Sequence, residues 1–141
     1  MKFVRTGMMK GMNSSKEKRG AFWILEAEPE IRTLLAYLAE MKGYFPVVTW
    51  ATLDEAWQGL EAWKGGPQRE RVDCVISDFH LPDGNCLSWL ETVRAAVPQA
   101  RLVCCSGRSL KDFRGAFERL GARVVLKPQR LSDLFDLIEE G

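Results

Sequence analysis

Five short apolar runs alternate with amphipathic helical stretches along most of this chain, and this alternation limits the possible folds most strongly. The runs occupy residues 22–25, 45–50, 72–77, 101–106 and 124–126. Apolar runs of this length are typical of strands that are buried on both faces, as in parallel sheets. Strands that alternate with helices predict an α/β domain whose parallel sheet is covered by helices on both faces.

Local signals indicate where the helices begin and end. Pro29 suits the first turn of a helix, where its missing N–H costs nothing, and Gly43 ends the same helix. The segment 52–55, Thr-Leu-Asp-Glu, is a capping box and predicts the start of a second helix. We also expect Ser109 to cap the fourth helix.

Length and composition fit one domain without disulfides. The chain has 141 residues, of which 46% are hydrophobic and 28% charged, enough to build a single core. Its four cysteines form no C-x-x-C pair and there is one histidine, so we expect reduced thiols packed as small hydrophobic groups. No apolar run approaches the roughly 18 residues that cross a bilayer, which predicts a cytoplasmic protein without membrane contact.

Charge separates the first 20 residues from the rest. Residues 1–20 carry six basic residues and one acidic residue, whereas residues 21–141 have a net charge of −4. We therefore expect a basic, disordered N-terminal extension (1–20) followed by one folded domain (21–141). The mild acidity of that domain argues against nucleic-acid binding by the domain itself.

Reactive side chains follow the predicted strands. Ligands of open parallel sheets bind beyond the carboxyl ends of the strands. The residues at these ends are Glu26, Ala27, Glu28, Asp78, Ser106 and Lys127. Neighbouring carboxylates repel each other unless a cation lies between them, and Mg²⁺ suits oxygen ligands. An aspartate can also accept a phosphoryl group, whose charge a lysine and a hydroxyl can balance.

Four segments, in this order, make the chain similar to the receiver domains of bacterial two-component response regulators. They are residues 25–30, 76–84, 105–107 and 121–128, and the resemblance covers about residues 21–140. It implies a flavodoxin-like (βα)5 doubly wound fold with a five-stranded parallel sheet of order 2-1-3-4-5. Asp78 matches the phosphorylation site, Ser106 the hydroxyl that turns toward the phosphate, and Lys127 the lysine that pairs with it.

The resemblance implies phosphorelay signalling rather than an enzyme, beyond self-phosphorylation and dephosphorylation. A histidine kinase or phosphotransfer protein would donate a phosphoryl group to Asp78, and a protein–protein surface would then change its binding to a downstream protein. The domain would act as a monomer or homodimer. Mg²⁺ would be held by Glu26, Asp78 and the backbone carbonyl of His80, with Glu28 as a further candidate.

Two positions depart from the family pattern. Ala27 stands where the family has a second acid that contacts Mg²⁺, so Mg²⁺ binding is expected to be weakened or absent. Val124 stands where the family often has an aromatic switch. The alternative is therefore a pseudo-receiver, a binding module of the same fold that is not phosphorylated.

Enzymes and carriers of other families fit less well. A phosphohydrolase with an aspartate nucleophile typically has Asp-x-Asp, but the sequence here is Asp78-Phe79-His80. A flavodoxin-type flavin carrier needs a phosphate-cradling loop after the first strand, where Glu26 and Glu28 would repel a phosphate.

Overall fold

The computed structural model describes residues 3–5, 19–67, 69–127 and 131–140. The strands are β1 (Phe3–Arg5), β2 (Ala21–Leu25), β3 (Val47–Trp50), β4 (Val72–Asp78), β5 (His80–Leu81), β6 (Gly84–Asn85), β7 (Arg101–Ser106) and β8 (Ala122–Leu126). The helices are α1 (Pro29–Met41), α2 (Leu53–Lys64), α3 (Leu87–Ala96), the 3-10 turn η1 (Lys111–Phe113), α4 (Arg114–Leu120) and α5 (Leu131–Glu140). No helix among these residues is long and apolar enough to span a membrane.

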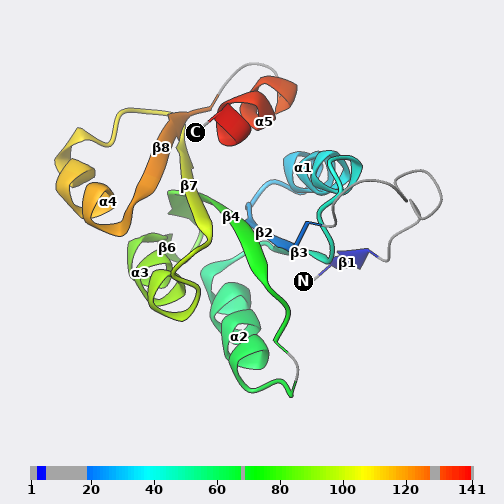
Figure 1. The fold of residues 1–141 in the computed structure, drawn as a ribbon. Coiled ribbons are helices and arrows are strands. Elements are labelled where there is room, and N and C mark those ends of the chain that lie inside the picture. The colour runs from blue at the N-terminus through cyan, green and yellow to red at the C-terminus, as the bar shows by residue number, and fades with distance from the viewer. Residues whose placement is uncertain (1–2, 6–18, 68, 128–130, 141) are drawn as a thin grey trace.

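The sheet has the strand order β1-β3-β2-β4-β7-β8 (Figure 1). The five strands β3, β2, β4, β7 and β8 are parallel to one another. This arrangement confirms the predicted order 2-1-3-4-5. The sixth strand, β1, pairs antiparallel with β3, with Val4 opposite Val48. The N-terminal extension was expected to be disordered, but residues 3–5 form a strand, because they pair with the main chain at the edge of β3. Residues 6–18 lie outside the described residues.

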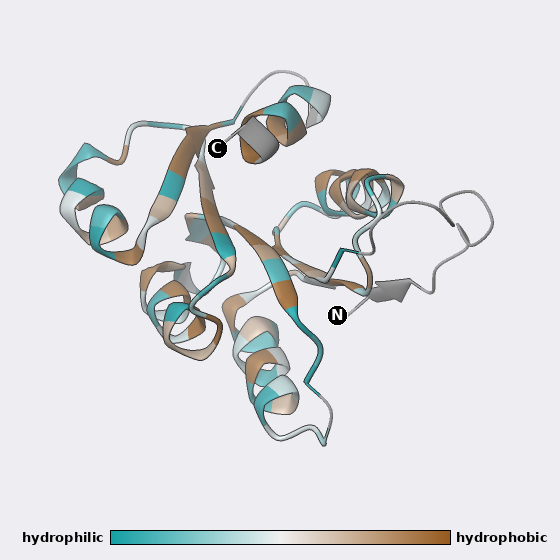
Figure 2. Cartoon of the chain, in the orientation of Figure 1, coloured by the Kyte–Doolittle hydropathy of each residue, from teal (hydrophilic) through white to brown (hydrophobic). Residues whose placement is uncertain are grey.

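Helices cover both faces of the sheet, as Figure 1 shows. One face packs against α1 and α5, and the other against α2, α3 and α4. The first core contains Phe22, Ile24, Leu35, Ala39, Ile76, Val103, Leu134, Phe135 and Ile138, and the second contains Trp23, Trp50, Leu60, Val75, Trp89, Leu90, Val93, Leu102 and Phe117. Because successive strand residues enter opposite cores, the strands are apolar along much of their length, interrupted by a few hydrophilic positions (Figure 2).

The helix starts agree with the sequence signals except at one place. The Thr52 hydroxyl accepts a hydrogen bond from the Glu55 N–H at 3.1 Å, which confirms the predicted cap of α2. The prediction for Ser109 is wrong: the chain passes through η1 before α4 begins at Arg114, and no side chain caps either start. A serine before an apolar helical pattern is a local signal, but here the buried Leu110 occupies the position before η1, so Ser109 lies outside the helix start.

The four cysteines are buried free thiols, as the sequence predicts. The Sγ atoms of Cys86 and Cys104 lie 3.7 Å apart in the core under α3. This mutual contact and burial raise the pKa of the Cys104 thiol, so it stays protonated and acts as a packing group.

Candidate functional site

Asp78 is the last residue of β4, at the carboxyl end of a central strand. Its register partner is Cys105 of β7, and the next N–H, that of Phe79, donates to the Cys105 carbonyl at 2.9 Å. The Asp78 residue is only 6% exposed. Its carboxylate therefore lies where the pairing between two inner strands ends, which is the place that the sheet topology predicts for a ligand.

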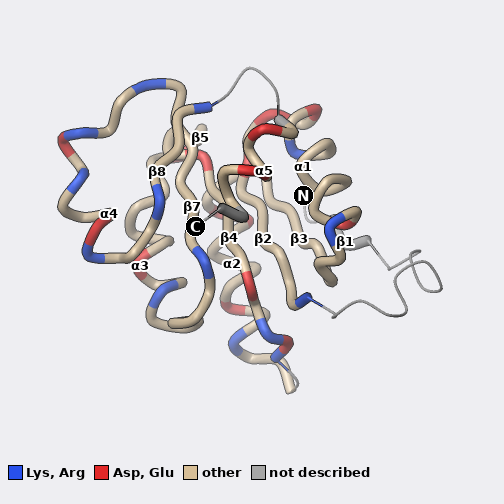
Figure 3. The backbone as a smooth tube through the Cα atoms, turned by 45° about the horizontal axis from the view of Figure 1, so that its top comes forward, with Lys and Arg blue, Asp and Glu red and all other residues tan. Residues whose placement is uncertain are grey.

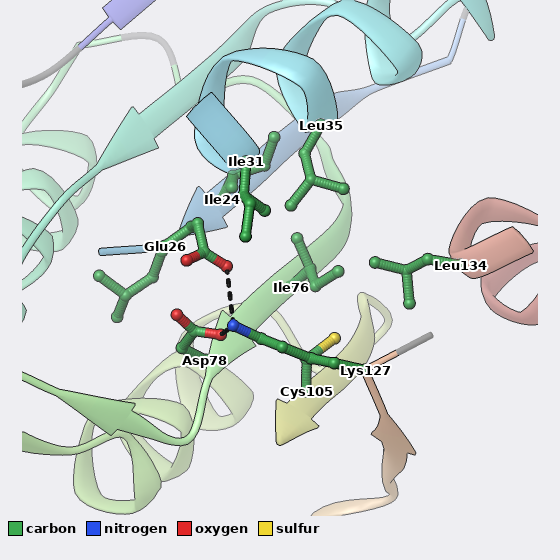
Figure 4. A pocket seen from close by; sticks show the side chains of 10 residues that line it. Ile24, Glu26, Ile31, Leu35, Ile76, Asp78, Cys105, Lys127 and Leu134 are labelled. Carbon is green, nitrogen blue, oxygen red and sulfur yellow. Dashed lines mark ion pairs between the residues drawn. The ribbon is translucent and has the colours of Figure 1, made fainter. Parts of the chain in front are cut away.

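Lys127 follows β8 and reaches across the sheet edge to two carboxylates. Its Nζ lies 2.8 Å from Oδ1 of Asp78 and 3.5 Å from Oε1 of Glu26 (Figure 4). Its backbone N–H donates to the Ser106 carbonyl at 2.8 Å, which continues the pairing of β7 with β8. Three residues from three strand ends thus form one charged cluster. Figure 3 shows acidic segments at the start of α1 and a basic segment after β8 at the same end of the sheet.

Glu26 is the most perturbed acid of the cluster. It follows β2, is 3% exposed, and lies next to apolar side chains of β2 and α1 (Figure 4). Burial, together with the hydrogen bond and negative charge of Asp78, raises the pKa of Glu26 from 4.5 to about 7. The Glu28 N–H, 3.0 Å from Oε2, and the Lys127 ammonium act in the opposite direction. Near neutral pH this carboxyl group therefore exchanges readily between its two protonation states.

Lys127 remains a cation in this setting. Burial lowers its pKa, but the hydrogen bond to Asp78 and the charges of Asp78 and Glu26 outweigh that effect and raise the pKa overall. An ammonium group held this way can balance the charge of a phosphoryl group on a neighbouring oxygen.

The turn after β2 contributes its main chain to the site. The Ala27 N–H lies 3.5 Å from Oδ2 of Asp78. Arg32, in the first turns of α1, donates to the carbonyls of Glu26 and Ala27 at 2.8 and 3.2 Å. Arg32 therefore holds the turn in place, a role that the sequence pattern did not indicate.

The other predicted site residues lie around this cluster. Ser106 ends β7 with 2% exposure, and its hydroxyl accepts from the Arg108 N–H at 3.2 Å. Glu28 is exposed and contacts Glu26 through its own N–H. The His80 residue is exposed and its ring packs against Phe79 with 4.8 Å between centroids. The structure therefore brings Glu26, Asp78 and Lys127 into direct contact, and Ser106 joins them through the Lys127 main chain.

Comparison with known protein families identifies the family to which a chain with this site belongs. The family model described as the response regulator receiver domain matches residues 22–139. The chain belongs to the response regulator receiver domain family. Receiver domains are signalling domains, so this membership sets the chain apart from the phosphohydrolases and flavin carriers considered from the sequence. No match was found among curated proteins.

Solved structures confirm the receiver fold. A CheY-like receiver domain protein from Methanospirillum hungatei is 21% identical, with a TM-score of 0.68 over 88% of this chain and 93% of that chain. A Burkholderia pseudomallei response regulator with a phosphorylated aspartic acid and a calcium ion is 20% identical, with a TM-score of 0.68 over 86% of this chain and 66% of that one. TrrA from Thermotoga maritima, in complex with Mg²⁺ and BeF, is 22% identical, with a TM-score of 0.61 over 88% of this chain and 98% of that chain.

The receiver site offers a reduced set of ligands for a divalent cation. Within the described part of the chain, no group of three or more His, Cys, Asp or Glu side chains is arranged to hold a metal ion. Mg²⁺ nevertheless often binds through one or two carboxylates and several waters. Glu26 and Asp78 are two such carboxylates. They lie near enough to each other for one cation to contact both, as the Lys127 ammonium does. Ala27 supplies no further oxygen from its side chain.

One further residue near the receiver site was missed from the sequence. Asp83, in the turn between β5 and β6, accepts hydrogen bonds from the N–H groups of Leu53 and Asp54 at 2.9 and 3.0 Å. In the sequence Asp83 stands only as part of segment 76–84, because a cap supplied to a helix about 30 residues away leaves no local pattern.

Proposed function

We propose that this receiver domain accepts a phosphoryl group on Asp78 from a histidine kinase or a phosphotransfer protein. The observation that carries the proposal is the pairing of a buried strand-end aspartate with Lys127, at 2.8 Å between Oδ1 and Nζ. A surface lysine that happened to lie near a capping aspartate would not also contact a second buried carboxylate, as Lys127 does with Glu26. The pair is therefore built to hold negative charge at this point of the sheet.

In the proposed reaction, one carboxylate oxygen of Asp78 forms a bond to phosphorus. The bond between phosphorus and the donor nitrogen of a phosphohistidine breaks, and that nitrogen keeps the electron pair. Mg²⁺, held by Glu26, Asp78 and the His80 carbonyl, with Glu28 as a further candidate, would neutralise the phosphoryl oxygens. Lys127 keeps its charge throughout, as its raised pKa requires, and offsets the added charge.

Phosphorylation would act on partner binding through the end of β7 and the connection to α4. A phosphoryl group adds a charge of about −1.5 to −2 and strong acceptor oxygens, which favour any conformation that brings donors to it. Ser106 lies two residues before Arg108, whose N–H now binds the serine hydroxyl. In the proposed switch the hydroxyl leaves this N–H and donates to the phosphoryl group, and the β7–α4 surface changes for a downstream protein.

One observation favours a second candidate function, that of a pseudo-receiver. Ala27 has no side-chain carboxylate to offer a cation, and among the described residues no group of three or more His, Cys, Asp or Glu side chains is arranged to hold a metal ion. If Glu26 and Asp78 hold Mg²⁺ too weakly, the fold serves as a binding module whose Asp78 stays paired with Lys127. The two candidates differ in whether Asp78 becomes modified.

Intact mass spectrometry after incubation with acetyl phosphate and millimolar Mg²⁺ separates the two candidates. We expect the parent protein to gain one phosphoryl group and Asp78→Asn to gain none. Asp136→Asn, which changes an exposed acid on α5, is the matched control and should be modified like the parent. A parent that gains no mass, either with the small donor or with a panel of purified phosphorylated histidine phosphotransfer domains, would support the pseudo-receiver.

A further inference from the structure

Asp83 joins the loop after the phosphoacceptor strand to the start of α2. Its two carboxylate oxygens take the first two N–H groups of that helix, those of Leu53 and Asp54. The next N–H, that of Glu55, goes to the Thr52 hydroxyl. The free N–H groups at the start of α2 are thus hydrogen-bonded partly by the adjoining Thr52 and partly by Asp83, which lies about 30 residues further along the chain. Anionic acceptors are favoured at this positively polarised end.

The segment tied down by Asp83 begins next to Asp78. Its base is fixed to the sheet, because the Phe79 N–H donates to Cys105 at 2.9 Å and the Cys86 N–H donates to the Phe79 carbonyl at 3.1 Å. Its two short strands pair His80 with Asn85 and Leu81 with Gly84.

The tip of the segment lies close to α2. A Cβ atom on Gly84, whose φ is +139°, would lie 3.1 Å from Cδ1 of Leu53. Glycine is therefore suited to this position for two reasons, its φ value and the nearness of α2. The main chain of His80 lies between the fixed base and a tip that Asp83 holds against the helix.

We propose that Asp83 is a positioning residue, which fixes segment 79–86 against the N-terminus of α2 and so sets the place of the His80 carbonyl beside Asp78. This inference rests on the proposed function, in which that carbonyl binds Mg²⁺. Groups that orient a metal ligand without touching the metal typically contribute about 10- to 100-fold in affinity. Asp83 is such a group, acting on the His80 carbonyl through only three residues of chain.

The test compares Asp83→Ala with Thr52→Ala, which removes a cap from the same helix end without touching segment 79–86. Tryptophan fluorescence during Mg²⁺ titration gives the apparent affinity, and thermal unfolding gives the stability of each variant. We expect both variants to lose similar stability, but only Asp83→Ala to lose about tenfold in Mg²⁺ affinity. Equal Mg²⁺ affinities in the two variants would overturn the proposal, because Asp83 would then be a helix cap alone.

Hydrogen exchange makes the inference testable even if the proposed function fails. A parent protein that neither binds Mg²⁺ nor gains a phosphoryl group refutes the proposed function, whatever Asp83 does. In that case exchange of the Cys86 N–H, which closes the base of the segment, still reports on positioning. Faster exchange at Cys86 in Asp83→Ala, but not in Thr52→Ala, supports the fixed segment. Unchanged exchange at Cys86 in Asp83→Ala overturns it.

Discussion

Replacing Glu26 by glutamine should stabilise the metal-free protein at high pH and change little at low pH. Burial and the neighbouring Asp78 carboxylate raise the pKa of Glu26 from 4.5 to about 7 in the folded state. Between these values the folded protein holds a proton that the unfolded chain has released. The free energy of unfolding therefore falls as the pH rises through this window, and the full cost is present above about pH 7. Glutamine carries no charge and avoids that cost.

The magnitude follows from the shift in pKa. Each pKa unit corresponds to about 1.4 kcal/mol, so a rise from 4.5 to about 7 corresponds to an upper limit of about 3 kcal/mol. This limit already includes the opposing effect of the Lys127 ammonium, which lies 3.5 Å from Glu26. We expect Glu26→Gln to raise the free energy of unfolding by about 1–3 kcal/mol at about pH 8, and by much less at about pH 5.

Urea unfolding followed by tryptophan fluorescence, at both pH values with EDTA present, measures this difference. Glu28→Gln is the matched control, because it removes a nearby carboxylate that is exposed, and its effect should be small at both pH values. The reasoning is wrong if Glu26→Gln has the same effect at both pH values, or if it destabilises the protein more at about pH 8 than at about pH 5.

Three further changes test other parts of the structure. Ala27→Asp restores a carboxylate at the turn after β2, and isothermal titration calorimetry should show Mg²⁺ affinity rising about tenfold or more; an unchanged affinity would contradict the role given to this position. Lys127→Met leaves two buried carboxylates without their cation, and urea unfolding at about pH 8 should show a loss of about 3–5 kcal/mol, part of which Glu26→Gln recovers in the double variant. Gly59→Ala would push a Cβ into the Trp50 ring, so we expect a loss of about 1–3 kcal/mol and an altered near-ultraviolet circular dichroism spectrum; a spectrum like that of the parent would show that the ring moves freely.

Much of the architecture was predictable from local patterns. The five apolar runs are the five parallel strands, and Pro29, Gly43 and Thr52 mark helix ends where the structure has them. Such signals depend on side-chain period and on backbone dihedrals, which are properties of a few neighbouring residues. Asp78 and Lys127 were predicted to meet because the carboxyl ends of parallel strands lie at one edge of the sheet.

Features that depend on distant main chain were not predictable in the same way. Residues 3–5 pair with the edge of β3, and a run of three residues is too short to show the alternating pattern that predicts a strand. Asp83 caps α2 only because the fold brings two loops together, and the chain passes through η1 instead of starting a helix at Ser109. For β1 and for the Asp83 cap, the deciding contact joins groups that are far apart in the chain.

The family, the strand order and the three residue types at the strand ends follow from the order of residues along the chain. The way in which those groups affect one another follows from the folded arrangement. The 2.8 and 3.5 Å contacts of Lys127 and the raised pKa of Glu26 depend on burial and on distances between side chains from three strands. Electrostatic energy varies with distance and with exposure to solvent, and neither is written in the order of residues along the chain.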